Sequence, residues 1–539
     1  MKRGAPFVAT LGILVVSWVQ QLGVRPTNFG GWDEWLVIDL TSRGILGLPY
    51  QNRPFSLVFT QPGALALPGS LRGYWLAHGL YLSLAGVLLH RLCRRLAPGR
   101  ERLALLAGAL AVSWAPLDDI RLDTVLVASY AGFTFATLLA MVLLVESALA
   151  RHRGGLAVAA ALAFLLVRGL EATAGLVLAA PALLWLVPGV ERRTRAAWSL
   201  AWLSGALAAA ALVGAPLLGG GAASYQVSGL GFDPHPFRVA GRLLGQLGFH
   251  LGPLLAPRAG ELLAPGVPAA ALALGGAWLL LGRSAPGDEA GPGGGAWRLA
   301  AVGLSLAVLA SSVMALSPSA VVPARMQILS APGIGLFLAA VMVGLGELGG
   351  PRVRHLPLVL GAAVVAMGAG RTAALQQAWD AKSYWAAQDR GLFGLTRAAP
   401  QLERSSFVLL LDDAGAWPAS FTFQHALRYL YGGRADGSVW GAEPFLYPTR
   451  LVAEGVLFTP YESIRGPWRV PARLYRYDEV VVVRQSRDGR VSVLDAWPAA
   501  LPPLPSGAGY APRARIRSQD PPPPEHGLLV GPSEGGGLR

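Results

Sequence analysis

Long apolar runs recur along the first two thirds of the chain and constrain its fold more than any other feature. A transmembrane helix needs about 20 consecutive, mainly apolar residues, because the hydrocarbon core of a bilayer is about 30 Å thick. Runs of this kind, some of them short, lie at 6–24, 73–92, 102–117, 124–149, 154–168, 172–188, 196–218, 267–282, 299–316, 328–347 and 355–370. The sequence therefore predicts an all-α polytopic membrane bundle of about eleven transmembrane helices.

The composition favours a membrane protein over a nucleic-acid-binding one. Only 14% of the 539 residues are charged, whereas soluble proteins carry about 25%. The net charge of +14 comes from arginines that stand in short bursts beside apolar runs, which is a pattern of membrane topology. The single cysteine, Cys93, excludes an internal disulfide and a cysteine zinc cluster.

The placement of the arginines predicts which side of the membrane each junction faces. Basic residues gather at alternate junctions, 2–3, 91–102, 151–153, 192–195, 283–298 and 352–354. By the positive-inside rule these junctions are cytoplasmic, the N-terminus is inside, and an odd helix count puts the C-terminal region outside. The richness in arginine, alanine and glycine is typical of a bacterial sequence, so we expect the bacterial cytoplasmic (inner) membrane.

Three domains follow from these patterns. Residues 1–370 form the membrane domain, and residues 371–498 are expected to form a small external (periplasmic) α/β domain. Its signals are an amphipathic stretch over 372–395, a short apolar strand over 406–411, and a hairpin turn at Asp488-Gly489. Residues 499–539 are rich in proline and glycine and are predicted to form a disordered tail.

The acidic pair Asp33-Glu34 is the most informative part of the first external loop. It stands just beyond the first helix, at the membrane–water boundary where a lipid head group would lie. A partly desolvated carboxylate there can act as a general base on a hydroxyl. The alternative is a solvated loop start between the interfacial tryptophans Trp32 and Trp35.

Further charged residues are expected on the same external face. Asp118 and Asp119 belong to an acidic cluster in the second external loop, where they suit an acceptor or metal site. The alternative for the neighbouring Asp123 is a helix cap. Arg325 is the lone cation of a late external loop, where its planar fork can hold a phosphate or serve as an interfacial anchor. The acidic clusters permit a divalent metal ion without requiring one, so no metal ligand and no cofactor is assigned.

Together these residues and the topology of about residues 1–370 resemble the GT-C superfamily of membrane glycosyltransferases, which includes protein mannosyltransferases and lipid A aminoarabinose transferases. The shared features are the Asp33-Glu34 pair, the acidic residues of the second external loop, a Pro-x-Arg ending at Arg325, and an external C-terminal region. Asn52-Arg53-Pro54 stands where those transferases often carry a His-Pro-Pro type element, which leaves the acceptor class open.

The resemblance implies an inverting glycosyltransferase that uses a polyprenyl-phosphate sugar donor and an envelope lipid, glycan or protein acceptor. It implies that Asp33 deprotonates the acceptor hydroxyl with Glu34 nearby, and that Asp118 or Asp119 positions the acceptor. Arg325, together with Arg53, would stabilise the departing lipid phosphate.

Other functions remain as alternatives. A polytopic transporter or flippase should show matched halves with broken helices or charges inside its spans. An O-antigen-type polymerase or ligase would also use polyprenyl-linked sugars, and a non-catalytic envelope assembly protein would present only its C-terminal domain. Activity that survives the loss of Asp33 would favour the last of these.

Overall fold

The computed structural model describes residues 4–48, 53–113, 119–218, 233–256, 260–261, 264, 266–284, 294–317, 327–461 and 470–517. Each of the eleven predicted apolar runs contains helix within the described residues. They correspond to α1 (Ala5–Leu22), α4 (Leu71–Leu96), α5 (Glu101–Ser113), α6 (Leu126–Ala150), α7 (Arg153–Gly169), the pair α8 (Ala174–Ala179) and α9 (Ala182–Leu186), α10 (Arg192–Leu218), α12 (Val267–Ser284), α13 (Gly294–Leu316), α14 (Gln327–Leu348) and α15 (Leu356–Lys382).

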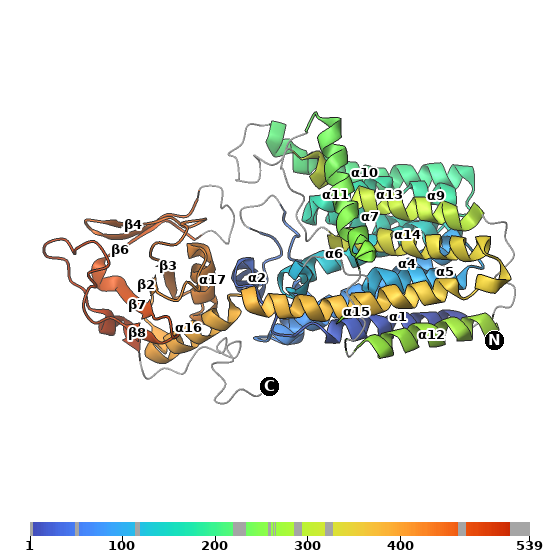
Figure 1. Ribbon diagram of the computed structural model, residues 1–539. Coiled ribbons are helices and arrows are strands. Elements are labelled where there is room, and N and C mark those ends of the chain that lie inside the picture. Colours follow the sequence, from blue (N-terminus) through green and yellow to red (C-terminus); the bar gives the residue numbers. More distant parts are fainter. Residues whose placement is uncertain are drawn as a thin grey trace.

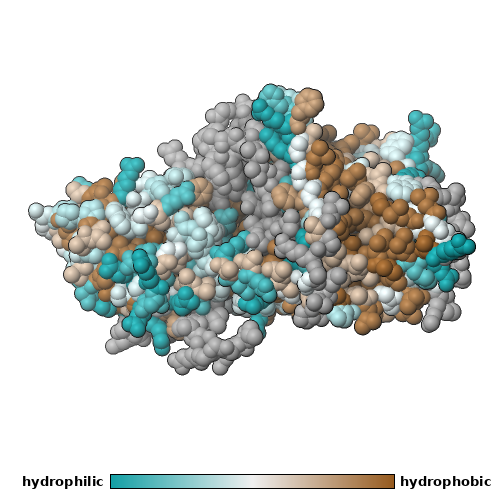
Figure 2. All heavy atoms as spheres, viewed as in Figure 1, coloured by the Kyte–Doolittle hydropathy of each residue, from teal (hydrophilic) through white to brown (hydrophobic). Residues whose placement is uncertain are grey.

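The helices form an elongated bundle with the C-terminal domain at one end (Figure 1). Among the described residues, six helices are long and apolar enough to cross a membrane, and the shorter stretches Pro6–Leu22, Glu171–Leu186 and Val267–Gly282 add to them. Figure 2 shows hydrophobic side chains over the bundle and a more hydrophilic surface on the C-terminal domain. The chain is therefore a multi-pass membrane protein, as predicted.

Arginines gather at the end of the bundle that lies opposite the C-terminal domain. Arg91 and Arg95, near the end of α4, both pair with Glu146 near the end of α6. Arg100, just before α5, pairs with Glu347 near the end of α14. We propose from the positive-inside rule that this end faces the cytoplasm.

A long helix, α11 (Pro236–Leu255), lies between the predicted runs 196–218 and 267–282 and was not predicted. Figure 1 shows that it runs across the bundle and not along it. Arg242 on this helix pairs with Asp233 at 2.8 Å and donates to the carbonyl oxygen of Ala315 at 3.0 Å. Arg238 and Arg242 interrupt the apolar residues of this amphipathic helix and lower its mean hydropathy. A search for long apolar runs therefore does not find α11.

The C-terminal domain is α/β, as predicted. α16 (Trp385–Ala398) follows α15 after a break at Ser383, and α17 (Ser420–Leu430) connects two strands. The main sheet has the order β3-β2-β7-β8, in which the first three strands are parallel. The strands of the domain are β1 (Gln401–Leu402), β2 (Ser406–Asp412), β3 (Ala435–Val439), β4 (Thr449–Val452), β5 (Gly455–Phe458), β6 (Arg473–Tyr475), β7 (Val480–Gln485), β8 (Val491–Val493) and β9 (Ile516–Arg517).

The hairpin signal at Asp488-Gly489 is confirmed, because β7 and β8 pair antiparallel on either side of it. Gly489 has φ +83°, a conformation that glycine adopts without strain. Residues 499–517 were assigned to the disordered tail, but the structure shows them as part of the domain. β9 pairs with β1, and the Tyr510 hydroxyl donates to the carbonyl oxygen of Leu494 at 2.7 Å. Residues 518–539 lie outside the described residues.

The first external loop contains two short helices, α2 (Asp33–Ser42) and α3 (Gln61–Ala66). Trp35, Leu36, Val37, Ile38 and Leu40 of α2 belong to the same apolar core as the strands of the C-terminal domain. This core is distinct from the core of the helical bundle. α2 is therefore packed as part of the C-terminal domain, although some 340 residues of bundle separate the two in sequence.

Candidate functional site

A pocket lies where α2 meets the end of the bundle. The cavity itself has a volume of about 50 Å³, and about 540 Å³ when the gaps between side chains and the open solvent at its mouth are included. The polar lining comes from Asp33, Arg53, Ser56, Ser129 and Tyr130. The apolar lining is formed by Leu36, Val37, Leu48, Leu57, Leu126, Phe133, Gly169 and Leu170. One carboxylate and one guanidinium thus share a mainly apolar pocket, which suits an amphiphilic ligand with a charged head group.

Asp33 is the first residue of α2 and is half-buried at the pocket wall. The chain reaches it through Gly31, whose φ of +90° would strain any residue with a side chain. Asp33, Leu36 and Val37 all line the pocket, because residues three and four apart lie on one face of a helix. The structure places Asp33 in the wall of this pocket, and its predicted role as a general base remains a proposal.

Glu34 points away from this pocket and holds the loop that precedes α2. One carboxylate oxygen accepts from the Gly30 amide at 3.0 Å, and the other accepts from the Trp32 amide at 2.6 Å. The side chain is only 3% exposed and does not line the pocket. Glu34 thus shapes the loop before Asp33, and its predicted part in the chemistry beside Asp33 remains a proposal.

Asp123 forms a buried carboxyl pair with Glu34. One Asp123 oxygen accepts from the amides of Val125 and Leu126, each at 3.0 Å, so it caps the start of α6. Burial raises the pKa of Asp123 well above its ordinary value, and the neighbouring Glu34 charge raises it further. The two carboxyl groups share a hydrogen bond, which favours the protonated form of Asp123. The helix-cap alternative for Asp123 is confirmed.

This pair predicts a pH dependence of stability. Because the pKa of Asp123 is raised on folding, the stability that its proton contributes is full below the ordinary value of 3.8. It is lost as the pH rises through the raised pKa. Asp123→Asn keeps a neutral donor and a good cap. We expect its melting temperature to fall less than that of the wild type as the pH rises from below 3.8 through the raised pKa of Asp123. Parallel melting curves across this range would contradict the shared proton.

Arg53 is fixed beside the pocket by an ion pair. Its Nε donates to the Glu171 carboxylate at 2.6 Å, and its NH2 group contacts the other oxygen of the same carboxylate. Glu171 begins the short helix η2 (Glu171–Thr173), between α7 and α8. Both side chains are largely buried, so the pairing fixes the direction of the guanidinium. No local sequence pattern links the two residues, because 118 positions separate them.

Three of the predicted site residues cannot be placed in this pocket. Asp118 and Arg325 lie outside the described residues, and for Asp119 the structure describes only the backbone, which begins the short helix η1 (Asp119–Leu122). Their predicted roles remain proposals. Within the described ranges, no group of three histidine, cysteine, aspartate or glutamate side chains is placed to hold a metal ion.

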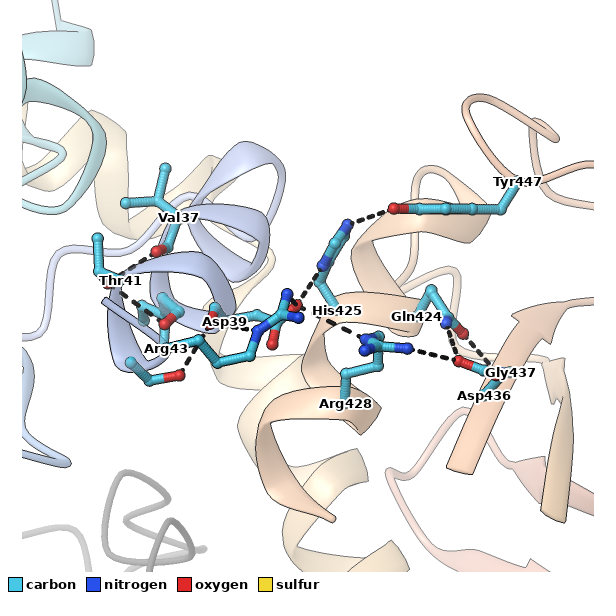
Figure 3. A network of polar contacts seen from close by, with 12 residues as sticks. Val37, Asp39, Thr41, Arg43, Gln424, His425, Arg428, Asp436, Gly437 and Tyr447 are labelled. Atoms are coloured by element: carbon cyan, nitrogen blue, oxygen red, sulfur yellow. Dashed lines mark hydrogen bonds and ion pairs between the residues drawn. The ribbon is translucent and has the colours of Figure 1, made fainter. Parts of the chain in front are cut away.

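A second polar network joins α2 to the C-terminal domain, and sequence reasoning missed it. Figure 3 shows Asp39 of α2 directed at His425 of α17. The Asp39 Oδ2 atom lies 2.7 Å from His425 Nδ1, and His425 Nε2 lies 3.1 Å from the hydroxyl of Tyr447. All three side chains are buried. No local pattern marks this contact, because 386 residues separate Asp39 from His425.

The protonation state of this network follows from its burial. Burial lowers the pKa of His425 despite the opposing effect of Asp39. The imidazole is therefore neutral near pH 7, so Nδ1 donates to the carboxylate and Nε2 accepts from the Tyr447 hydroxyl. Burial also raises the pKa of Tyr447, which keeps its proton. Arg43 and Arg428 supply the positive charge next to Asp39, at 2.8 and 3.9 Å.

The fold and the pocket define a multi-pass membrane protein whose candidate site lies between the end of its helical bundle and its C-terminal domain. No family model and no curated protein matches the sequence. Among the solved structures that match is ArnT from Cupriavidus metallidurans in the apo state, which is 16% identical over 74% of this chain and 81% of that chain. The TM-score is 0.39, and at this level the likeness says nothing about the site.

Proposed function

We propose that this chain is a membrane glycosyltransferase. In this proposal a sugar moves from a polyprenyl-phosphate donor to an envelope lipid, glycan or protein acceptor on the external face, with inversion. The observation that supports it is the pocket in which Asp33 and Arg53 lie together among mainly apolar side chains. A lipid-linked sugar phosphate has the matching parts, which are an anionic group, a polar sugar and an apolar chain.

The proposed reaction assigns one task to each charged group. The acceptor hydroxyl oxygen attacks the anomeric carbon of the sugar while the Asp33 carboxylate takes its proton. The bond between that carbon and the phosphate oxygen breaks on the opposite side, so the configuration inverts. The lipid phosphate leaves with the electron pair, and the Arg53 guanidinium stabilises its negative charge. Arg325 remains a second proposed phosphate ligand, and Asp118 and Asp119 remain proposed for the acceptor.

The direct test is donor turnover by the full chain in lipid nanodiscs. Radiolabelled polyprenyl-phosphate sugars are supplied as a panel, with an envelope extract as the source of acceptor. The proposal predicts transfer of label from one donor to the extract. The chain is also reconstituted in sealed vesicles, where movement of label across the membrane without transfer would instead indicate a transporter or flippase.

The Arg53–Glu171 ion pair allows a test of phosphate binding that separates binding from structure. Arg53→Gln is expected to weaken donor binding about ten- to hundredfold, because a hydrogen bond to a charged group contributes about 1.5–3 kcal/mol. Glu171→Gln removes the competing carboxylate but keeps the shape of the side chain. We expect that variant to bind the donor as well as or better than the wild type.

The control is the double variant Arg53→Gln with Glu171→Gln, in which no unpaired charge stays buried. Donor binding is measured by competition with a fluorescent polyprenyl phosphate. If the double variant binds like the wild type, Arg53 serves the fold and not the phosphate.

A further inference from the structure

We infer that the C-terminal domain positions the Asp33 carboxylate, and that Gln388 is the main positioning residue. The inference rests on the proposed function for its activity readout, but its structural basis is independent of that function. α2 is attached to the C-terminal domain at both ends by buried polar contacts. The domain is thereby an integral part of the site and not a cap placed over it.

The loop that leads into Asp33 is paired step by step with the end of α15 and the start of α16. The side-chain amides of Asn28 and Gln376 bond each other twice, at 2.7 Å each. The Ser383 hydroxyl donates to the carbonyl oxygen of Phe29, and the Tyr384 amide donates to that of Gly30 at 3.1 Å. Each residue between 28 and 30 thus has its own partner in the segment that enters the C-terminal domain.

Gln388 completes this series at the position closest to Asp33. Its Nε2 atom donates to the carbonyl oxygens of Gly31 and Ala416, each at 2.8 Å, and its Oε1 atom accepts from the Trp35 indole at 2.8 Å. The side chain is fully buried. Gln388 therefore binds the backbone of Gly31, two residues before Asp33, and the side chain of Trp35, two residues after it.

Gly31 shows how closely this contact is fitted. A Cβ atom on Gly31 would lie 2.6 Å from Gln388 Oε1 and 2.8 Å from Tyr384 Cβ. A side chain at position 31 would therefore clash with Gln388, and the φ of +90° would strain its backbone. Glycine avoids both problems. Phe29, Trp35 and Trp385 pack around the contact with ring centroids 4.9 to 6.0 Å apart, which excludes water from the bonds of Gln388.

The edge of the parallel sheet supports Gln388 from the other side. Ala416 lies in the loop after β2, at the carboxyl edge where β2 stands between β3 and β7. Asp412 holds this loop by accepting from the Trp417 amide at 2.9 Å, and the Trp417 indole donates to Gln485 at 3.1 Å. Open α/β sheets commonly bind ligands at this edge. Here the loop at this edge binds Gln388 through Ala416, and Gln388 in turn binds the loop that leads to Asp33.

Helical periodicity assigns the two faces of α2 to the two tasks. Asp33, Leu36 and Val37 line the pocket, whereas Trp35 and Asp39, four residues apart, contact Gln388 and His425. The contacts of Trp35 and Asp39 with the C-terminal domain thus fix the orientation of α2, and with it the direction of the Asp33 carboxylate. A general base acts only within hydrogen-bond reach of its proton, and a misplacement of about 1 Å can cost about a hundredfold in rate.

The test compares two buried glutamines of the same domain, each replaced by methionine, which is similar in length. Gln388→Met removes the bonds to the Asp33 loop. The control, Gln424→Met, removes bonds to Asp436 and the Gly437 amide that stay within the C-terminal domain. Both side chains are fully buried. Hydrogen exchange of the full chain in nanodiscs is measured over residues 28–36 and over residues 435–439.

We expect Gln388→Met to speed exchange over residues 28–36 by about tenfold or more and to leave residues 435–439 unchanged. Gln424→Met should give the reverse pattern. In the transferase assay, Gln388→Met should lower kcat by about ten- to hundredfold with little change in KM. Trp35→Phe, a milder change on the α2 side, should move both readouts in the same direction.

The positioning role would be overturned if Gln388→Met and Gln424→Met had the same exchange rate over residues 28–36, whether that rate is unchanged or raised. Absence of donor turnover in the wild type would instead overturn the proposed function and leave the exchange result to decide the positioning role. The two failures are therefore distinguishable.

Discussion

Asp33→Asn is expected to reduce sugar transfer by about a hundredfold to ten-thousandfold, the contribution typical of a positioned general base. The amide has almost the same shape as the carboxylate but cannot take a proton from the acceptor hydroxyl. Asp33 is half-buried at the pocket wall, and its neighbours Leu36 and Val37 line the same pocket, so the substitution changes the chemistry without emptying the site. Donor binding should change far less than the rate.

The measurement is the rate of label transfer with a saturating donor, made beside a matched carboxylate variant. Asp413→Asn serves as that control, because Asp413 lies on the C-terminal domain in an ion pair with Arg484 that is largely exposed. Its rate should equal that of the wild type. Equal rates for Asp33→Asn and the wild type would remove Asp33 from the mechanism.

The second large effect is expected for stability. Asp39→Ala should lower the free energy of unfolding of the C-terminal domain by about 3–5 kcal/mol, the usual cost of removing one partner from a buried charged pair. Asp39 is 2% exposed and accepts from His425 and Arg43. Without it, the Nδ1–H group of His425 and two guanidinium groups lose a common buried anion.

Denaturant unfolding followed by the fluorescence of the domain tryptophans checks this value. Asp39→Asn keeps an acceptor for His425 and loses only the charge, so its effect should be smaller. Asp478→Ala, which breaks a solvent-exposed pair with Arg476, should have little effect. An Asp39→Ala variant as stable as the wild type would show that α2 docks without this network.

The parts of the fold that the sequence predicts are those that the bilayer or local geometry dictates. Apolar runs must become helices in lipid because each backbone group has to be paired within its own segment. The Asp488-Gly489 turn is a local signal and was predicted correctly. α11 was missed because its apolar residues are interrupted by Arg238 and Arg242, and residues 499–517 were missed because composition does not report the β1–β9 pairing.

The same distinction between local and long-range signals applies to the residues of the candidate site. Asp33, which lines the pocket, could be singled out because an acidic pair beside a membrane helix is visible in the sequence. The task of Glu34, its neighbour, could not be, since it depends on backbone amides and on Asp123 folding next to it. Gln388 and His425 carry no distinguishing signal in the sequence. Their partners Gly31 and Asp39 lie 357 and 386 residues away. Contacts of such range leave no periodic signal in one sequence.

The most direct test of the central claim is photo-crosslinking with a polyprenyl phosphate that carries a diazirine near its phosphate. The full chain in nanodiscs is irradiated with the probe, digested, and the labelled peptides are identified by mass spectrometry. The account predicts label on the pocket walls, within residues 53–57 and 126–133, and competition by unlabelled donor. Label confined to the arginine-rich end of the bundle, or unaffected by competitor, would contradict it.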